Sequence, residues 1–189
     1  MKPLLLLPLL VLSAAVAACG DDAAKTNDVA DTSANTTAEK PADNVDPDTI
    51  RVYTSAEVCA LIPEATAAAT LGVELTAVAP SDLSTPQCSF EFTLSDGVRS
   101  NLTLAVQRPN EDLAGLAGKA GFDFTTSLVI FDIPYVPLAG VGDEAAVSSS
   151  DTFTIIAVLV NNQVFTLATS SGLPVANVAA FGSAVAASL

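Results

Sequence analysis

The sequence predicts an α+β domain, in which an antiparallel sheet of about four to six strands has short N-terminal helices before it and a C-terminal helix after it. Three observations support this fold class. Residues 54–72 combine a capping sequence with helical apolar spacing, residues 73–168 contain several stretches with the two-residue alternation of strands, and residues 175–189 return to helical spacing. Half of the 189 residues are hydrophobic, which is enough for the core of one domain.

Two short helices are expected at the start of this domain. The first begins at the capping box Thr54-Ser55-Ala56-Glu57, in which the Thr54 hydroxyl and the Glu57 carboxylate each satisfy a free backbone amide. It directs the apolar residues between 58 and 62 toward the core. The second starts at Pro63 and Glu64 and ends at Gly72, because glycine readily adopts the left-handed conformation that closes a helix.

Alternating apolar and polar residues then predict a series of strands. The first lies at 73–77, and the second, at 88–94, is joined by the turn Ser95-Asp96-Gly97 to a third at 102–106, which forms a hairpin with it. A further strand opens at Gly140 and continues through Val147. Strands at 153–159 and 164–168 follow, and Asn161-Asn162 joins them, since asparagine tolerates a left-handed backbone.

The middle and the end of the domain carry two further helical patterns. Residues 109–119 have acids at their front, which favours the helix dipole, although Gly115, Gly118 and the nearby Gly121 make this helix marginal. Residues 122–137 stay undecided, because their prolines would interrupt a central strand. Residues 175–189 carry apolar side chains along one helical face.

The N-terminal residues 1–18 have the layout of an export signal, a signal peptide that is removed. Lys2 precedes an apolar run through Val16, and two small alanines follow. A membrane-spanning helix is the alternative, but it needs about 20 apolar residues. Here Pro3 and Pro8 interrupt a run that is shorter.

Val16-Ala17-Ala18-Cys19 resembles the lipobox of bacterial lipoproteins. The resemblance implies that the chain is cut before Cys19, that the Cys19 sulfur receives a diacylglyceryl group, and that the new amino group takes a fatty acyl chain such as palmitate. Two or more such chains hold a protein stably at a membrane. We therefore expect a lipid-anchored, extracytoplasmic protein of the cell envelope. Because Gly20 follows the cysteine, the resemblance points to the outer membrane, facing the periplasm, if the host has two membranes.

Residues 19–48 contain the lipidated cysteine and an acidic segment that we expect to be a disordered tether. Its side chains are mostly small or polar, so they cannot offset the entropy of ordering. As a flexible coil it reaches on the order of 30 Å. The alternative is an acidic arm that captures a basic partner or divalent cations. Its acids are Asp21, Asp22, Asp28, Asp31, Glu39, Asp43, Asp46 and Asp48.

Residues 49–189 form the single α+β domain, which holds two of the three cysteines, Cys59 and Cys88. In an exported protein this even pair predicts a disulfide, which stabilises the fold by roughly 3 to 4 kcal/mol in the chain-entropy model. A metal site or a catalytic thiol is the alternative. The chain has no histidine and no CxxC spacing, which disfavours both.

The domain resembles small lipoprotein domains of actinobacteria, a family without an assigned activity. The matching residues are Cys59, Leu71-Gly72, Cys88-Ser89-Phe90 and the segment 140–145. The family usually has tryptophan in place of Phe90 and begins the domain with Asp-Pro-Cys, and this chain has neither. The resemblance therefore implies a fold rather than an activity.

The sequence predicts no catalytic, metal-binding or cofactor-binding residue. Asp143 and Glu144 are adjacent on an expected strand and point to opposite faces, so we interpret them as a turn and its solvated rim. The serines have no histidine to activate them. The four bases of the domain do not form the basic patch that nucleic-acid binding requires. They are Arg51, Arg99, Arg108 and Lys119.

Two classes of function stay open beside a purely structural role. The preferred hypothesis is a non-catalytic binding domain that takes a protein partner or a small apolar ligand between helix and sheet. The alternative is a carboxylate-based hydrolase of an envelope glycan, which requires two acids that converge across a cleft. The acids considered for that reaction are Glu91, Asp96, Asp143 and Glu144.

Overall fold

The computed structural model describes residues 50–83, 85–108, 118–129, 132–170 and 172–189. These residues belong to one compact unit. The expected signal peptide, Cys19 and the expected tether lie outside the described residues, and so does most of the helix expected at 109–119. Among the helices that the structure describes, none has the length and apolar character needed to span a bilayer.

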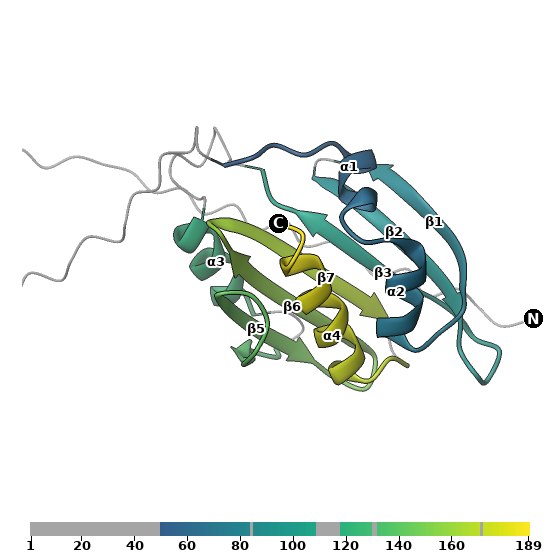
Figure 1. Cartoon of the computed structure of the whole chain (residues 1–189). Coiled ribbons are helices and arrows are strands. Elements are labelled where there is room, and N and C mark those ends of the chain that lie inside the picture. Colours follow the sequence, from purple (N-terminus) through teal and green to yellow (C-terminus); the bar gives the residue numbers. More distant parts are fainter. Residues whose placement is uncertain (1–49, 84, 109–117, 130–131, 171) are drawn as a thin grey trace, which may run out of the picture. The chain divides into compact units, whose positions relative to one another are not determined.

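The centre of the domain is an antiparallel sheet of seven strands, in the order β1-β2-β3-β7-β6-β5-β4 (Figure 1). This confirms the α+β class and the antiparallel pairing. The strands are β1 (Leu75–Asp82), β2 (Pro86–Thr93), β3 (Arg99–Val106), β4 (Val136–Pro137), β5 (Glu144–Ser149), β6 (Phe153–Val160) and β7 (Gln163–Ser170).

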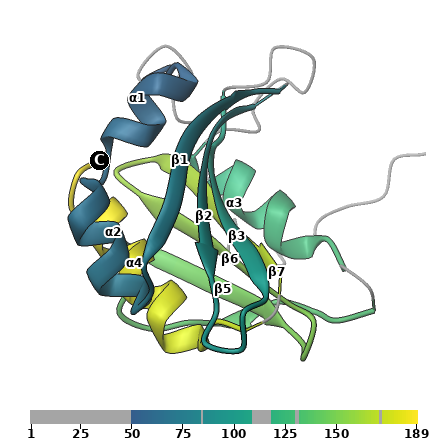
Figure 2. The same cartoon turned by 90° about the vertical axis from the view of Figure 1, so that its right-hand side faces the viewer.

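Helices cover the two faces of the sheet unequally. The helices α1 (Ser55–Ala60), α2 (Glu64–Leu71) and α4 (Val175–Ala186) lie on one face, whereas α3 (Gly118–Ser127) lies on the other (Figure 2). The α3 helix packs mainly against β6 and β7. Of the described helices, α3 alone lies on this face, and the part of the face over β1, β2 and β3 carries no described helix (Figure 2).

The main core fills the space between the sheet and α1, α2 and α4. Phe90 of β2 meets Phe181 of α4 edge to face, with ring centroids 5.1 Å apart. Each fully buried side chain of this size contributes about 1.5 to 3 kcal/mol. The largest fully buried side chains are Phe90, Phe92, Phe165, Phe181, Leu71, Leu102, Leu104, Ile156 and Leu167.

The predicted caps and hairpin turns are confirmed. Thr54 and Glu57 form the capping box of α1, and Gly72 is the left-handed C-cap of α2. The β6–β7 turn has both Asn161 and Asn162 in the left-handed region, with φ of 48° and 62°. The sequence is sufficient to predict these caps and turns, because each depends on only a few neighbouring residues.

Two parts of the predicted fold were wrong. The sheet has seven strands rather than four to six, because β4 pairs Val136 with Val147 at the sheet edge. A two-residue strand is too short to show alternation, and an edge strand tolerates Pro137 since no further ladder needs its amide. The helices also differ from the expected placement, because α3 occupies part of the undecided stretch 122–137.

The position of α3 follows from its packing rather than from helix propensity. Gly118 and Gly121 are buried, so the helix backbone approaches its neighbours where these glycines lie. Phe122 packs in a second cluster with Ala157 of β6 and Val164 of β7. This burial offsets the cost of about 1 kcal/mol that each glycine adds to a helix.

A disulfide between Cys59 and Cys88 ties α1 to β2, as predicted from the sequence. Beside it, the buried Ser55 hydroxyl accepts a hydrogen bond from the Gln87 amide (3.3 Å) and donates one to the Ser81 carbonyl (2.8 Å). This hydroxyl therefore bridges β1 and β2. The first helix is thus fixed to the sheet by one covalent bond and two hydrogen bonds.

Candidate functional site

The uncovered part of the sheet presents polar side chains. In β2, the residues Cys88, Phe90 and Phe92 are buried in the core, so strand alternation turns Ser89 and Glu91 to the opposite face. The same alternation applies in β3, where Leu102 and Leu104 are buried. This face therefore offers hydrogen-bonding groups to the solvent.

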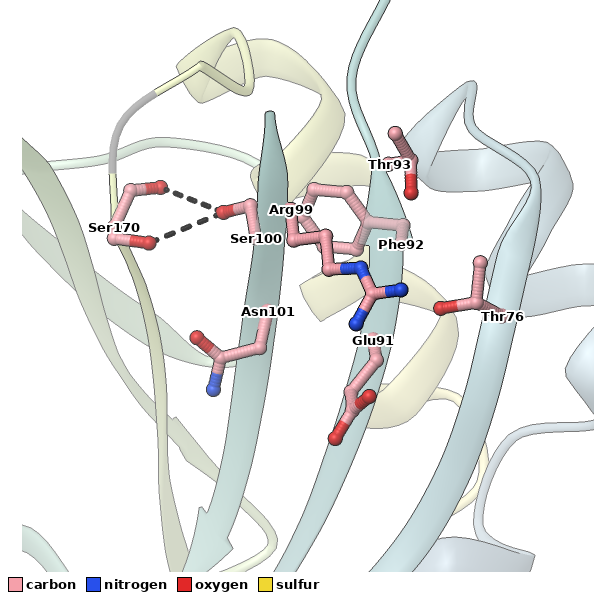
Figure 3. Close-up of a pocket in the computed structure, with 8 residues that line it drawn as sticks. All are labelled: Thr76, Glu91, Phe92, Thr93, Arg99, Ser100, Asn101 and Ser170. Carbon is pink, nitrogen blue, oxygen red and sulfur yellow. Dashed lines mark hydrogen bonds between the residues drawn. The ribbon is translucent and has the colours of Figure 1, made fainter. Parts of the chain in front are cut away.

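A pocket of about 460 Å³ lies on this part of the sheet (Figure 3). Four strands contribute to it, at the point where β1 and β3 begin and β2 and β7 end. The register of β2 with β3 places Glu91 opposite Asn101 and Thr93 opposite Arg99. The lining residues are Thr76, Glu91, Phe92, Thr93, Arg99, Ser100, Asn101 and Ser170.

Hydrogen bonds between β3 and β7 fix one side of this pocket. The Ser100 and Ser170 hydroxyl oxygens lie 3.1 Å apart, and the Ser100 hydroxyl also lies 3.5 Å from the Ser170 carbonyl (Figure 3). Thr169 donates from its buried hydroxyl to the Asn101 carbonyl at 2.8 Å. These bonds hold Ser100, Asn101 and Ser170 in place without a ligand.

The charged side chains of the pocket have no partner within the described part of the chain. Neither the Arg99 guanidinium nor the Glu91 carboxylate forms a hydrogen bond or ion pair with a described residue, although the guanidinium extends toward Glu91 (Figure 3). By contrast, Arg51 pairs with Glu57 at 3.1 Å, and Lys119 pairs with two carboxylates. The polar groups of Arg99 and Glu91 are therefore free for a ligand.

A smaller pocket of about 240 Å³ lies near the C-terminus. Its Arg51 guanidinium lies over the Tyr53 ring, 4.5 Å from the centroid, and bonds to Glu57. The hydrogen bonds from Thr54 and Arg51 hold the pKa of Glu57 below its ordinary value. Since these charges already satisfy one another, this pocket is the weaker candidate.

Asp143 and Glu144 have structural partners. The Asp143 carboxylate accepts a hydrogen bond of 2.8 Å from the Asn161 amide and so supports the β6–β7 turn. Glu144 forms an ion pair of 3.1 Å with Lys119. The pKa of Lys119 is raised above its ordinary value, chiefly by its hydrogen bond to Asp123. These contacts fit the interpretation of both acids as a turn and its rim.

Two of the acids considered for hydrolysis, Glu91 and Glu144, lie far apart in the sheet. Glu91 is on β2 and Glu144 is on β5, which stand four strand positions apart in the sheet, or about 19 Å at the usual strand spacing. Asp96 accepts a hydrogen bond from the Val98 amide within its own turn. Two glycosidase carboxylates lie at most about 9.5 Å apart. Glu91 and Glu144 therefore cannot act as such a pair.

The sequence patterns do not indicate most of the pocket residues. Arg99 and Ser100 precede the strand predicted at 102–106, and Ser170 follows the strand predicted at 164–168. The available signal was the row of polar residues that alternates with the apolar ones in 88–94. Within the described residues, no group of three or more histidine, cysteine, aspartate or glutamate side chains is placed to hold a metal ion.

Comparison of the chain with protein-family models, with curated proteins and with solved structures finds no match.

Proposed function

We propose that this protein is a membrane-anchored, extracytoplasmic lipoprotein whose domain binds a ligand or partner at the sheet pocket without catalysing a reaction. The observation that carries this proposal is that Arg99 and Glu91 have no partner among the described residues, in a pocket where hydrogen bonds fix Ser100, Asn101 and Ser170. Polar groups held in place before binding lose little entropy when a ligand arrives.

Binding is favoured over hydrolysis by the composition of this pocket. Glu91 is the one carboxylate among the described residues that line the pocket, so these residues supply no second carboxylate for glycoside hydrolysis. Its hydroxyls belong to Thr76, Thr93, Ser100 and Ser170, and the chain has no histidine to activate them. The pocket can therefore form hydrogen bonds, but it lacks the groups of a hydrolytic mechanism.

The space between helices and sheet, where the sequence led us to expect a small apolar ligand, is filled by side chains. Phe90, Phe92, Phe181 and Leu71 are all less than 2% exposed there. We therefore place the proposed binding site on the opposite face of the sheet. A polar ligand, or a polar segment of a protein partner, suits that face.

The anchored location is proposed from the sequence. The Val16-Ala17-Ala18-Cys19 lipobox supports lipid attachment at Cys19, and the acidic stretch that follows it supports a tether. The disulfide between Cys59 and Cys88 fits an oxidising compartment outside the cytosol.

One experiment in the native envelope tests both parts of this proposal. The full chain carries a photo-crosslinking amino acid at position 101, in the pocket, or at position 66, which is exposed on α2. We expect the mature protein to sit in the membrane fraction with a lipid-modified Cys19 at its N-terminus, and a crosslinked adduct to form from position 101 only. A Cys19→Ala variant should lose the lipid modification and the cleavage before residue 19.

The membrane anchoring and the binding at the pocket can each be contradicted separately. An uncleaved, unmodified N-terminus in the soluble fraction would overturn the anchoring. Equal adducts from positions 66 and 101, or none from position 101, would overturn the pocket as a binding site and leave a purely structural role.

A further inference from the structure

We infer that the sheet pocket binds an uncharged, multiply hydroxylated ring, such as the hexose or N-acetylhexosamine unit of an envelope glycan; this inference rests on the proposed function and specifies its ligand. The argument uses the kinds of polar group in the pocket, their charges and the exposure of its apolar side chains.

The free groups of the pocket match neighbouring hydroxyls. The Glu91 carboxylate accepts hydrogen bonds at two oxygens, and the Arg99 guanidinium donates from a planar fork. Asn101 adds an amide, whose nitrogen also donates a hydrogen bond of 3.4 Å to the Thr103 hydroxyl and whose oxygen is an acceptor, and Thr76 and Thr93 add hydroxyls. A sugar hydroxyl donates one hydrogen bond and accepts others, so a ring with adjacent hydroxyls can use the carboxylate and the guanidinium together.

The charge of the pocket selects against ions. Arg99 and Glu91 carry opposite charges, so the lining residues that the structure describes give the pocket no net charge. An anion would meet Glu91 and a chain of formal net charge −14, whereas a cation would meet Arg99. A neutral ligand that both donates and accepts hydrogen bonds avoids both conflicts.

The pocket offers little to an apolar ligand. Among the described lining residues Phe92 is the only aromatic one, and this side chain is 1% exposed because its ring is packed in the core. A sugar must therefore be held by hydrogen bonds without ring stacking. Such a small ligand, with modest contact per atom, should bind with a dissociation constant on the order of 1 mM.

The test is an NMR titration of the full, lipidated chain in a detergent that has no sugar headgroup. The probes are glucose, mannose and N-acetylglucosamine, with inorganic phosphate as the anion and free arginine amide as the cation. We expect at least one neutral sugar to shift the amides of Glu91, Asn101 and Ser170 saturably, and the two ions to cause no saturable shift there.

Matched variants separate recognition from a general effect of charge. Glu91→Gln and Arg99→Gln should each weaken the binding of that sugar at least fivefold. The first replaces a charged two-oxygen acceptor with one neutral acceptor and a donor, and the second removes the guanidinium donors. Glu64→Gln and Arg51→Gln make the same changes of charge on exposed residues that do not line this pocket, and should leave the affinity unchanged.

Several results would overturn the inference. They are the absence of a saturable shift with any sugar far above the expected constant, tighter binding of phosphate or arginine amide than of the sugars, and equal losses in the pocket variants and their controls. If position 101 still crosslinks in the envelope while no sugar binds, the sugar assignment falls and the proposed function stands. If position 101 does not crosslink, the binding site itself falls.

Discussion

At the scale of single residues, Gly142 is fixed by its backbone and by its neighbours. Its φ is +60°, and a Cβ atom added there would lie 2.6 Å from Val158 Cγ1 and 2.7 Å from the Leu159 carbonyl oxygen. The Leu159 carbonyl also accepts a hydrogen bond from the Asp143 amide, so the backbone cannot easily move away. Only glycine fits at this position.

Gly142→Ala should therefore lower the free energy of unfolding by about 3 kcal/mol, from backbone strain and overpacking together. Gly97→Ala is the matched control. Its φ is also positive, at +83°, but no atom lies within 4 Å of the added Cβ, so a loss of about 1 kcal/mol from backbone strain alone is expected. Urea denaturation of both variants measures the difference, and equal losses would contradict the role of the close contact.

At the scale of elements, the capping box of α1 makes a prediction about pH. The Glu57 carboxylate accepts hydrogen bonds from the Thr54 amide (2.8 Å) and hydroxyl (2.9 Å), and these lower the pKa of Glu57 below its ordinary value. Because the folded pKa lies below the unfolded one, this stabilisation is present above the unfolded pKa of about 4.5 and is lost as the pH falls through the folded pKa.

The stability advantage of the natural chain over Glu57→Gln should therefore be largest near neutral pH and shrink below about pH 4.5. Urea midpoints measured across that range give the comparison. Thr54→Ser keeps the hydroxyl of the cap and should keep the same pH dependence as the natural chain. An advantage that stays constant with pH would show that the capping carboxylate does not contribute.

The sequence predicts the centres of the strands better than their ends. The alternation in 88–94 and 102–106 identifies β2 and β3, because their apolar residues face one continuous core. The ends of these strands carry polar residues such as Arg99, where alternation no longer distinguishes strand from loop. The pocket is built from such ends, at Thr93, Arg99 and Ser170, so the sequence predicts the sheet but not the site on it.

The α3 helix is likewise not predictable from local sequence patterns. Its glycines argue against a helix when only local propensity is considered. The helix nonetheless forms from Gly118 to Ser127, because Phe122 is buried and the Gln107 side chain donates a hydrogen bond of 2.7 Å to the Thr125 hydroxyl. Both contacts join residues that are distant along the chain, and no local pattern reveals them.

At the scale of the whole domain, the Cys59–Cys88 disulfide closes a loop with a sequence separation of 29 and fixes the first helix to the sheet. Cys88 lies near the start of β2, whereas the pocket residues Glu91, Phe92 and Thr93 lie at its end. Stability and ligand binding should therefore respond differently when this bond is removed.

The double variant Cys59→Ala, Cys88→Ala should lose about 3 to 4 kcal/mol of unfolding free energy, because its unfolded chain regains the entropy that the loop withheld. A reducing agent should lower the stability of the natural chain by a similar amount and leave the variant unchanged. In the fraction that remains folded, the crosslink from position 101 should persist, since the strand ends that form the pocket are held by Ser100, Ser170 and Thr169 rather than by the disulfide. Loss of that crosslink in folded variant protein would show instead that α1 and its covalent link to β2 determine the shape of the binding face.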